Sequence, residues 1–307
     1  MSGRLLEKAW KRQRQARDWV IAQALFGLLA ILRRFPARKG LALADRLAQW
    51  IGPKTSRHRV AVENLRLAFP NMDEAAIQDL ARRNWGQMGR IAAEYVFLDD
   101  IFDFDPSKDA SDGMVEVEGI DVFLELRDNP KPIIFFTAHL GSFELLPICA
   151  AAIGIELTAL FRQPNNRYIA REVLSARRTR GGHLVPSKAG AAWALAGTLE
   201  RGGNVGMLVD QKFKRGEPTT FFGRPCRTNP LLPKLARKFE CDIYPARCVR
   251  LPGGRYRLSL EPRLDLARGP SGEIDVRASC QQLNDVVERW VREYPDQWMW
   301  FHRRWAM

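Results

Sequence analysis

A short stretch, residues 133–144, limits the possible folds of this chain more than any other. Its first four residues are branched or aromatic and apolar, which is typical of a strand buried on both faces. Gly141 then predicts a tight turn, and Ser142 predicts the N-cap of a following helix. The stretch therefore predicts a strand, a turn and a helix, with His139 just beyond the carboxyl end of the strand.

His139 and Glu144 lie on either side of this predicted turn. On one continuous helix, side chains five residues apart would point in different directions, but a strand–turn–helix junction allows them to meet. An imidazole beside a carboxylate suits a general base that an acid holds in orientation. The start of a helix would add backbone N–H donors and partial positive charge. A purely structural hydrogen-bonded pair is the alternative interpretation of these two residues.

From residue 115 onward, strand patterns alternate with helix patterns. Strands are predicted at 115–117, 133–136, 157–161, 183–185, 204–209, 243–249 and 256–260. Helices are predicted at 122–126, 145–153, 168–179, 189–199, 231–239 and 278–291, and a loop at 212–228. Helices of this length between strands predict an α/β fold with a mixed, largely parallel sheet flanked by helices.

Three of the predicted strands lead directly into His139, Arg162 and Asp210. The carboxyl ends of parallel strands line the ligand crevice in folds of this kind. We therefore expect these three side chains to share one edge of the sheet. For Asp210, a structural role in anchoring the loop that follows is the alternative to contact with a substrate.

The N-terminal region is basic and then apolar. Residues 19–32 are apolar apart from Gln23, and Arg33 and Arg34 follow them. A helix of this segment spans about 21 Å, less than the roughly 30 Å of a bilayer core. We predict an uncleaved membrane-associating helix within residues 1–39, either embedded in the membrane interface or inserted as a single pass, with an ordinary core helix as the alternative. A helical cap at 40–113 and an α/β core at 114–307 complete the predicted organisation.

Charge and cysteine content narrow the functional classes. A formal net charge of +13 predicts an acidic partner: nucleic acid, an anionic membrane or an acidic carrier protein. The sequence has no zinc-ligand spacing or ribonucleoprotein signature, which disfavours nucleic acid. Five cysteines without a C-x-x-C pair indicate free thiols in a reducing compartment. Dinucleotide, P-loop, H-E-x-x-H and G-x-S-x-G motifs are absent, so we expect no cofactor, no metal and no serine nucleophile.

The segment His139-Leu-Gly-Ser-Phe-Glu144 resembles the H-x4-[DE] signature of glycerolipid-type acyltransferases, in its H-x4-E form. The wider chain resembles the lipid A late acyltransferases, the lauroyl/myristoyl family of Gram-negative bacteria. The other blocks that carry this resemblance are Asn64–Pro70, Phe161-Arg162 with Asn166, Arg177, Asp210, Phe221-Phe222, Thr228, Leu235–Arg237 and Pro295–Arg304. Arg167 and Asn229-Pro230 depart from the family pattern, at positions that bear on acyl-chain and acceptor specificity.

This resemblance implies a glycerolipid-acyltransferase-like fold and the transfer of a fatty acyl chain from acyl carrier protein to a hydroxyl of a lipid A precursor. It places the reaction at the cytoplasmic face of the inner membrane, with phospholipid as a further partner and no nucleic acid. His139 would be the general base, and Glu144 would hold its imidazole. The substrate-binding residues would be Arg162, Asn166, Arg177 and Asp210.

Two other functions remain open at this point. A glycerophospholipid acyltransferase of the lysophosphatidate type would use the same chemistry, although such enzymes usually carry Asp where this chain has Glu144. The other is a non-catalytic basic protein that binds lipid or nucleic acid. In the C-terminal tail, we expect His302 to be packed or interfacial rather than a second base. Trp298 and Trp300 are expected either to close the core or to lie at the lipid headgroups.

Overall fold

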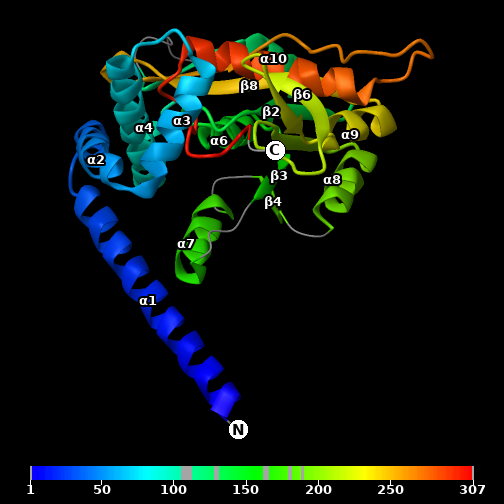
Figure 1. The fold of residues 1–307 in the computed structure, drawn as a ribbon. Coiled ribbons are helices and arrows are strands. Elements are labelled where there is room, and N and C mark those ends of the chain that lie inside the picture. Colours follow the sequence, from blue (N-terminus) through cyan, green and yellow to red (C-terminus); the bar gives the residue numbers. More distant parts are fainter. Residues whose placement is uncertain are drawn as a thin grey trace.

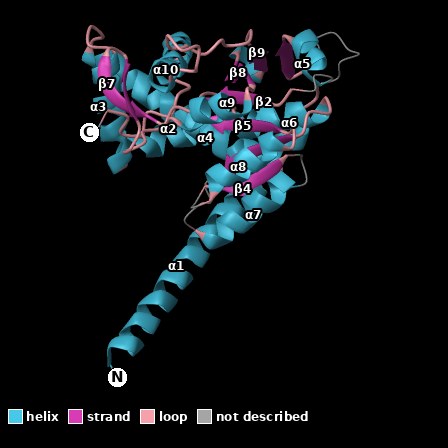
Figure 2. Cartoon of the chain, turned by 90° about the vertical axis from the view of Figure 1, so that its right-hand side faces the viewer, coloured by secondary structure: helices cyan, strands magenta, loops and turns pink. Residues whose placement is uncertain are grey.

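The protein is an α/β structure with a long helix at its N-terminus (Figures 1 and 2). A computed structural model describes residues 2–104, 113–127, 131–161, 166–178, 182–187 and 190–305. The helices are α1 (Ser2–Leu32), α2 (Ala37–Ile51), α3 (Ser56–Ala68), α4 (Glu74–Ile101), α5 (Ile120–Arg127), α6 (Leu145–Ala152), α7 (Arg167–Arg178), α8 (Ala191–Glu200), α9 (Leu231–Phe239) and α10 (Val276–Glu293). The strands are β1 (Val115–Glu118), β2 (Ile133–Thr137), β3 (Leu157–Phe161), β4 (His183–Pro186), β5 (Asn204–Leu208), β6 (Glu217–Phe221), β7 (Arg224–Thr228), β8 (Asp242–Arg250) and β9 (Tyr256–Leu260).

Seven strands form one sheet in the order β1-β9-β8-β2-β5-β3-β4. Every neighbouring pair is parallel except β8 and β9. The prediction of a mixed, largely parallel sheet is therefore confirmed. Strands β2 and β5 lie side by side, with Thr137 paired to Leu208. Two residues beyond this pair, the same register brings His139 opposite Asp210.

Alternate residues of β2 face two different layers of helices. Ile134 and Phe136 belong to a core that α3, α4, α8, α9 and α10 complete. Ile133 and Phe135 belong to a second core that α5 and α6 complete. This central strand is thus buried on both faces, as its apolar run predicts.

Helix α1 is much longer than the sequence pattern indicates. It is continuous over 31 residues, or about 46 Å at the usual rise per residue. Within it, Arg12–Leu32 is long and apolar enough to cross a membrane by length and composition, and only 11% of the apolar window is buried. In Figure 1 the N-terminal part of the helix projects away from the rest of the molecule. The polar residues before Trp19 continue the same helix, so it is longer than the apolar segment 19–32 alone. Whether it lies in the membrane interface or crosses the bilayer stays a prediction.

The segment predicted as a loop at 212–228 contains an antiparallel hairpin of β6 and β7. Phe222 and Gly223 connect the two strands and have φ angles of 52° and 69°. Two consecutive left-handed residues match the tight hairpin turn whose twist suits the flanking strands. The loop prediction is wrong because Pro218 and Pro225, which weaken a strand pattern, here occupy a short two-stranded ribbon.

Residues 40–101 are helical, as predicted, in α2, α3 and α4 with a short 3-10 turn, η1 (Gly52–Lys54). Leu65 of α3 and Leu80 of α4 lie in the same core as Ile134 of the sheet. The helical cap and the sheet therefore share buried surface. The proposed boundary near residue 113 stays a prediction, since residues 105–112 lie outside the described part of the chain.

Candidate active site

The imidazole of His139 is held by the carboxylate of Asp210. Nδ1 of His139 lies 2.8 Å from Oδ1 of Asp210, and the backbone N–H of His139 donates to Oδ2 at 2.9 Å. The indole N–H of Trp298 also donates to Oδ2, at 2.8 Å. A carboxylate accepts hydrogen bonds, so Nδ1 carries the proton and Nε2 is left with a lone pair. The geometry is that of a base whose tautomer is fixed by an acid.

Charge reinforces this pair. Burial alone would lower the pKa of His139, but the charge of Asp210, the hydrogen bond to it and the charge of Glu144 raise the pKa above its ordinary 6.5. Burial would likewise raise the pKa of Asp210, yet the imidazole of His139 and the donors around the carboxylate lower it to about 2. Asp210 is therefore ionised throughout the physiological range.

The sequence assigns the orienting role to Glu144, and the structure assigns that hydrogen bond to Asp210. Among the residues that the structure describes, the partners of the two ring nitrogens of His139 are Asp210 and Gln211. Glu144 acts on the imidazole through its charge. The difference arises from strand pairing: Asp210 is 71 residues away in sequence but sits at the end of the neighbouring strand. A spacing along the chain does not reveal that contact.

The turn after His139 is tightly packed rather than open. Gly141 has a φ of +55°, and a Cβ there would lie 2.0 Å from the carbonyl oxygen of Cys248. The backbone N–H of Ser142 donates to that same carbonyl at 2.9 Å. The prediction that Ser142 caps the next helix is wrong: α6 begins at Leu145, after Glu144. The Ser142 hydroxyl instead donates to Glu94 Oε2 at 2.8 Å.

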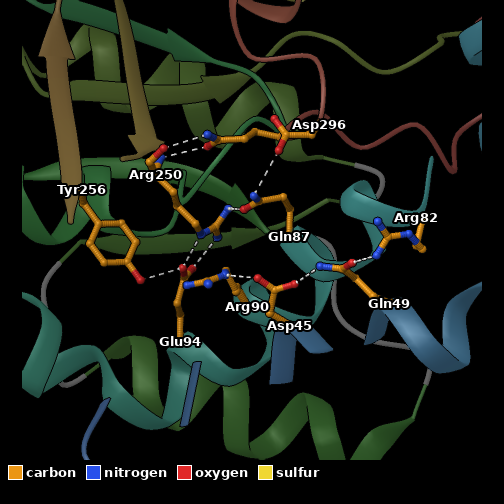
Figure 3. Close-up of polar contacts among 10 residues, drawn as sticks. Asp45, Gln49, Arg82, Gln87, Arg90, Glu94, Arg250, Tyr256 and Asp296 are labelled. Atoms are coloured by element: carbon orange, nitrogen blue, oxygen red, sulfur yellow. Dashed lines mark hydrogen bonds and ion pairs between the residues drawn. The ribbon is translucent and has the colours of Figure 1, made fainter. Parts of the chain in front are cut away.

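Glu94 belongs to a buried polar cluster, and Figure 3 shows its carboxylate bound by Arg250 and Tyr256. Its carboxylate accepts two hydrogen bonds from the Arg250 guanidinium, at 2.6 and 2.8 Å, and one from the Tyr256 hydroxyl at 3.0 Å. The side chain of Gln297 bonds both the N–H and the C=O of Arg250. With Ser142 as a fourth donor, the cluster joins α4, β8, β9 and the C-terminal tail to the loop that carries His139.

The C-terminal tail completes the frame around His139. The N–H of Met299 donates to the carbonyl of His139 at 3.0 Å. Trp298 and Trp300 are 1% and 0% exposed, so they close the core rather than lie at lipid headgroups. His302 is half-buried, and its Nε2 accepts from the N–H of Lys212 at 2.9 Å. Sequence reasoning missed the bond from Trp298 to Asp210, although the tail block of the resemblance contains this residue.

An apolar cavity of about 120 Å³ lies next to the site. Phe143 and Glu144 belong to its lining, and the ring of Phe143 meets that of His139 edge-on with centroids 5.2 Å apart. The remaining lining comes largely from β2, β3, β4, β5 and α6, and is mostly hydrocarbon. A hydrophobic chain that enters this cavity would therefore have its polar end close to the imidazole.

Of the predicted substrate-binding residues Arg162, Asn166 and Arg177, the structure describes the side-chain contacts of Asn166. Asn166 accepts from the N–H of Tyr168 at 3.0 Å, at the start of α7, and donates to the carbonyl of Asp18 in α1 at 2.5 Å. Its contacts tie these two helices together. Arg162 lies outside the described residues, as does the side chain of Arg177.

Comparison with known proteins identifies the family. The family model for bacterial lipid A biosynthesis acyltransferases matches residues 7–307, which is nearly the whole chain. This chain belongs to that family. Two curated relatives agree with the assignment, each 24% identical to this chain. One is lipid A biosynthesis acyltransferase 2 of Shigella flexneri, aligned over 90% of this chain and 86% of its own length. The other is a lipid A biosynthesis acyltransferase of Haemophilus influenzae, aligned over 92% and 86%.

Membership in the lipid A biosynthesis acyltransferases confirms the resemblance seen in the sequence. The chain is an acyltransferase of lipid A biosynthesis. This assignment disfavours the two alternatives, a glycerophospholipid acyltransferase and a nucleic-acid-binding protein. The family does not by itself give the acyl donor, the acceptor hydroxyl or the roles of individual side chains. Those depend on the geometry around His139.

Proposed function

We propose that this protein transfers a fatty acyl chain from the thioester of acyl carrier protein to a hydroxyl of an acylated lipid A precursor. The observation that carries the proposal is the His139–Asp210 pair at the sheet edge, with the proton on Nδ1 and the basic lone pair on Nε2. An alcohol is a poor nucleophile at neutral pH, so the reaction needs such a base. The acceptor hydroxyl would belong to a 3-hydroxyacyl chain.

In the proposed reaction, the hydroxyl oxygen attacks the thioester carbonyl carbon while Nε2 of His139 takes the hydroxyl proton. The tetrahedral oxyanion then collapses, the C–S bond breaks, and the thiolate takes the proton from the imidazolium. Asp210 stabilises that imidazolium. The positive end of α6 and the Arg162 and Arg177 side chains are our candidates for holding the oxyanion and the acceptor's phosphates.

Direct transfer, without an acyl-enzyme, is the form of the reaction that we propose. Burial raises the pKa of the Cys149 thiol to about 12, so the cysteine nearest Glu144 in sequence is a poor nucleophile. Ser142 uses its hydroxyl to donate to Glu94. Labelled acyl chain that stays on the protein after denaturation would contradict direct transfer.

The apolar cavity beside Phe143 is our candidate for the site of the acyl chain. Each methylene that leaves water for such a site contributes about 0.8 kcal/mol to binding. Glu144 lines the cavity near His139, where its negative charge favours the imidazolium that forms during the reaction. We propose this electrostatic role for Glu144 in addition to the orienting role of Asp210.

We place the reaction at the cytoplasmic face of the inner membrane. The support is helix α1, whose exposed Trp19, Val20, Ile21, Leu28 and Ile31 side chains suit a bilayer better than water. A net charge of +13 suits both anionic headgroups and an acidic carrier protein.

Lipid A composition tests the function. A strain that lacks this protein is expected to lose one acyl group of defined mass from its lipid A, measured by mass spectrometry. Purified full-length protein in detergent should restore that mass when given acyl carrier protein thioester and the under-acylated lipid. An unchanged lipid A profile in the deletion strain would contradict the proposal.

The rate should also depend on pH in a defined direction. Only neutral His139 can accept a proton, and the pKa of His139 is raised above 6.5. We therefore expect kcat/KM for transfer to fall as the pH is lowered, with the midpoint of the acidic limb above 6.5. The measurement is a pH–rate profile with the thioester at low concentration. A midpoint below 6.5 would contradict the role of Asp210 in supporting the imidazolium.

A further inference from the structure

Gln211 occupies the side of the imidazole that the reaction must use. Its amide nitrogen lies 3.2 Å from Nε2 of His139. Because Nδ1 keeps its proton and donates a hydrogen bond to Asp210, Nε2 can only accept, and the Gln211 amide must be the donor. The lone pair that has to take the acceptor's proton is thus already engaged in the substrate-free protein.

The backbone around Gln211 is anchored on both sides. Asp210 accepts from three donors, and the N–H of Lys212 donates to Nε2 of His302 at 2.9 Å. One residue further, the N–H of Phe213 donates to the carbonyl of Arg227 at 3.3 Å. The Gln211 side chain is only partly buried, so its amide can rotate while its backbone stays fixed.

We propose that the Gln211 amide caps the Nε2 lone pair of His139 in the resting enzyme by donating a hydrogen bond to it. The acceptor hydroxyl replaces this amide when it binds. Until then, the cap suppresses hydrolysis of the bound thioester. This inference rests on the proposed function. It makes Gln211 a positioning residue, because it acts through the imidazole rather than on the reacting carbon.

The unwanted reaction follows the same course as transfer. Water would attack the thioester carbon, Nε2 would take a proton from that water, and the C–S bond would break. The thiolate would then take the proton back from the imidazolium, leaving a free fatty acid and the carrier thiol. Either nucleophile must first replace the amide at Nε2. The lipid acceptor can offset the loss of the hydrogen bond between Gln211 and His139, because the remainder of the lipid makes further contacts with the protein. Water makes no such contacts.

Thioester hydrolysis by Gln211→Met tests the cap. Methionine has a similar length but cannot donate a hydrogen bond. Hydrolysis of acyl carrier protein thioester without acceptor is expected to rise about 3- to 10-fold, the factor that one neutral hydrogen bond accounts for. Transfer with saturating acceptor should change less, so the ratio of hydrolysis to transfer increases. A purely structural loss would lower both rates, and an unchanged or lower ratio would overturn the proposal.

Two controls fix the interpretation. Lys214→Met makes the same change at an exposed neighbour and is expected to keep the wild-type ratio. In Gln211→Met combined with His139→Ala, the extra hydrolysis should disappear. Persistence of that hydrolysis would show that His139 does not activate the water, which would also overturn the cap.

Chemical modification of His139 tests the cap without any thioester, so the result does not depend on whether the proposed acyl transfer is correct. Diethyl pyrocarbonate modifies the free lone pair of a neutral imidazole, and mass spectrometry reports the modification at each histidine. In Gln211→Met we expect His139 to be modified about 3- to 10-fold faster, relative to the exposed His183 in the same molecule. An unchanged relative rate would overturn the cap. A faster rate in a protein that proves to lack transfer activity would uphold the cap and reject the proposed function.

Discussion

Replacing Asp210 with asparagine is expected to slow acyl transfer by about 10²–10⁴-fold, which is the range that a positioned general base contributes. Three donors point at the Asp210 carboxylate: Nδ1–H and the backbone N–H of His139, and the indole N–H of Trp298. Asparagine offers only one acceptor oxygen. If that oxygen serves the two donors at the Oδ2 position, its NH₂ group faces Nδ1. The imidazole must then carry its proton on Nε2, where the lone pair is needed.

Matched substitutions show whether Asp210 or Glu144 orients the imidazole of His139. Glu144→Gln removes the other nearby charge and should cause a smaller loss, because Glu144 acts on the imidazole through charge. The measurement is kcat/KM for transfer to the lipid acceptor. The activity of His139→Ala gives the lowest value expected, the floor, because that variant lacks the base. In Asp210→Asn any remaining activity should show its acidic limb at lower pH, since the supporting charge is gone. Near-wild-type activity in Asp210→Asn, with Glu144→Gln at the His139→Ala floor, would identify Glu144 as the orienting acid.

The sequence predicted the sheet and the edge where the site lies, because both leave local signals. The apolar run at 133–136 is short and branched, and its burial on both faces follows from that pattern alone. The positions of His139 and Asp210 just after two such strands placed them at one edge. Local sequence patterns could not predict which carboxylate contacts the imidazole, because that contact depends on the pairing and register of β2 and β5.

Contacts between distant segments account for most of what the sequence did not reveal. Glu94 and Arg250 are 156 residues apart, and a single Glu in an amphipathic helix ordinarily indicates a solvated position. Gln211 carries no motif, and its role appears only once the tautomer of His139 is known. The extent of α1 was underestimated for a different reason: charged residues interrupt hydropathy without interrupting a helix.

Replacing Glu94 with glutamine is expected to lower the free energy of unfolding by about 3–5 kcal/mol, the usual cost of removing one partner from a buried ion pair. Glu94 is 2% exposed and Arg250 is 7% exposed, so the guanidinium would keep its charge without a counterion or much water. The measurement is urea unfolding followed by tryptophan fluorescence. Glu74→Gln is the matched control, because Glu74 also makes a bidentate pair, with Arg66, but on the surface. That variant should unfold close to the wild-type midpoint.

The same cluster should affect catalysis separately from stability. Glu94→Gln weakens the acceptor for the Ser142 hydroxyl, and so loosens the turn that follows His139. Replacing both partners with apolar residues, as in Glu94→Leu with Arg250→Met, removes the unpaired charge and should recover much of the lost stability. It cannot recover the bond to Ser142. We therefore expect the double variant to have a urea midpoint closer to that of the wild type than Glu94→Gln has. Its kcat for acyl transfer should nevertheless stay reduced. If kcat recovers along with stability, the cluster only stabilises the fold and does not position His139.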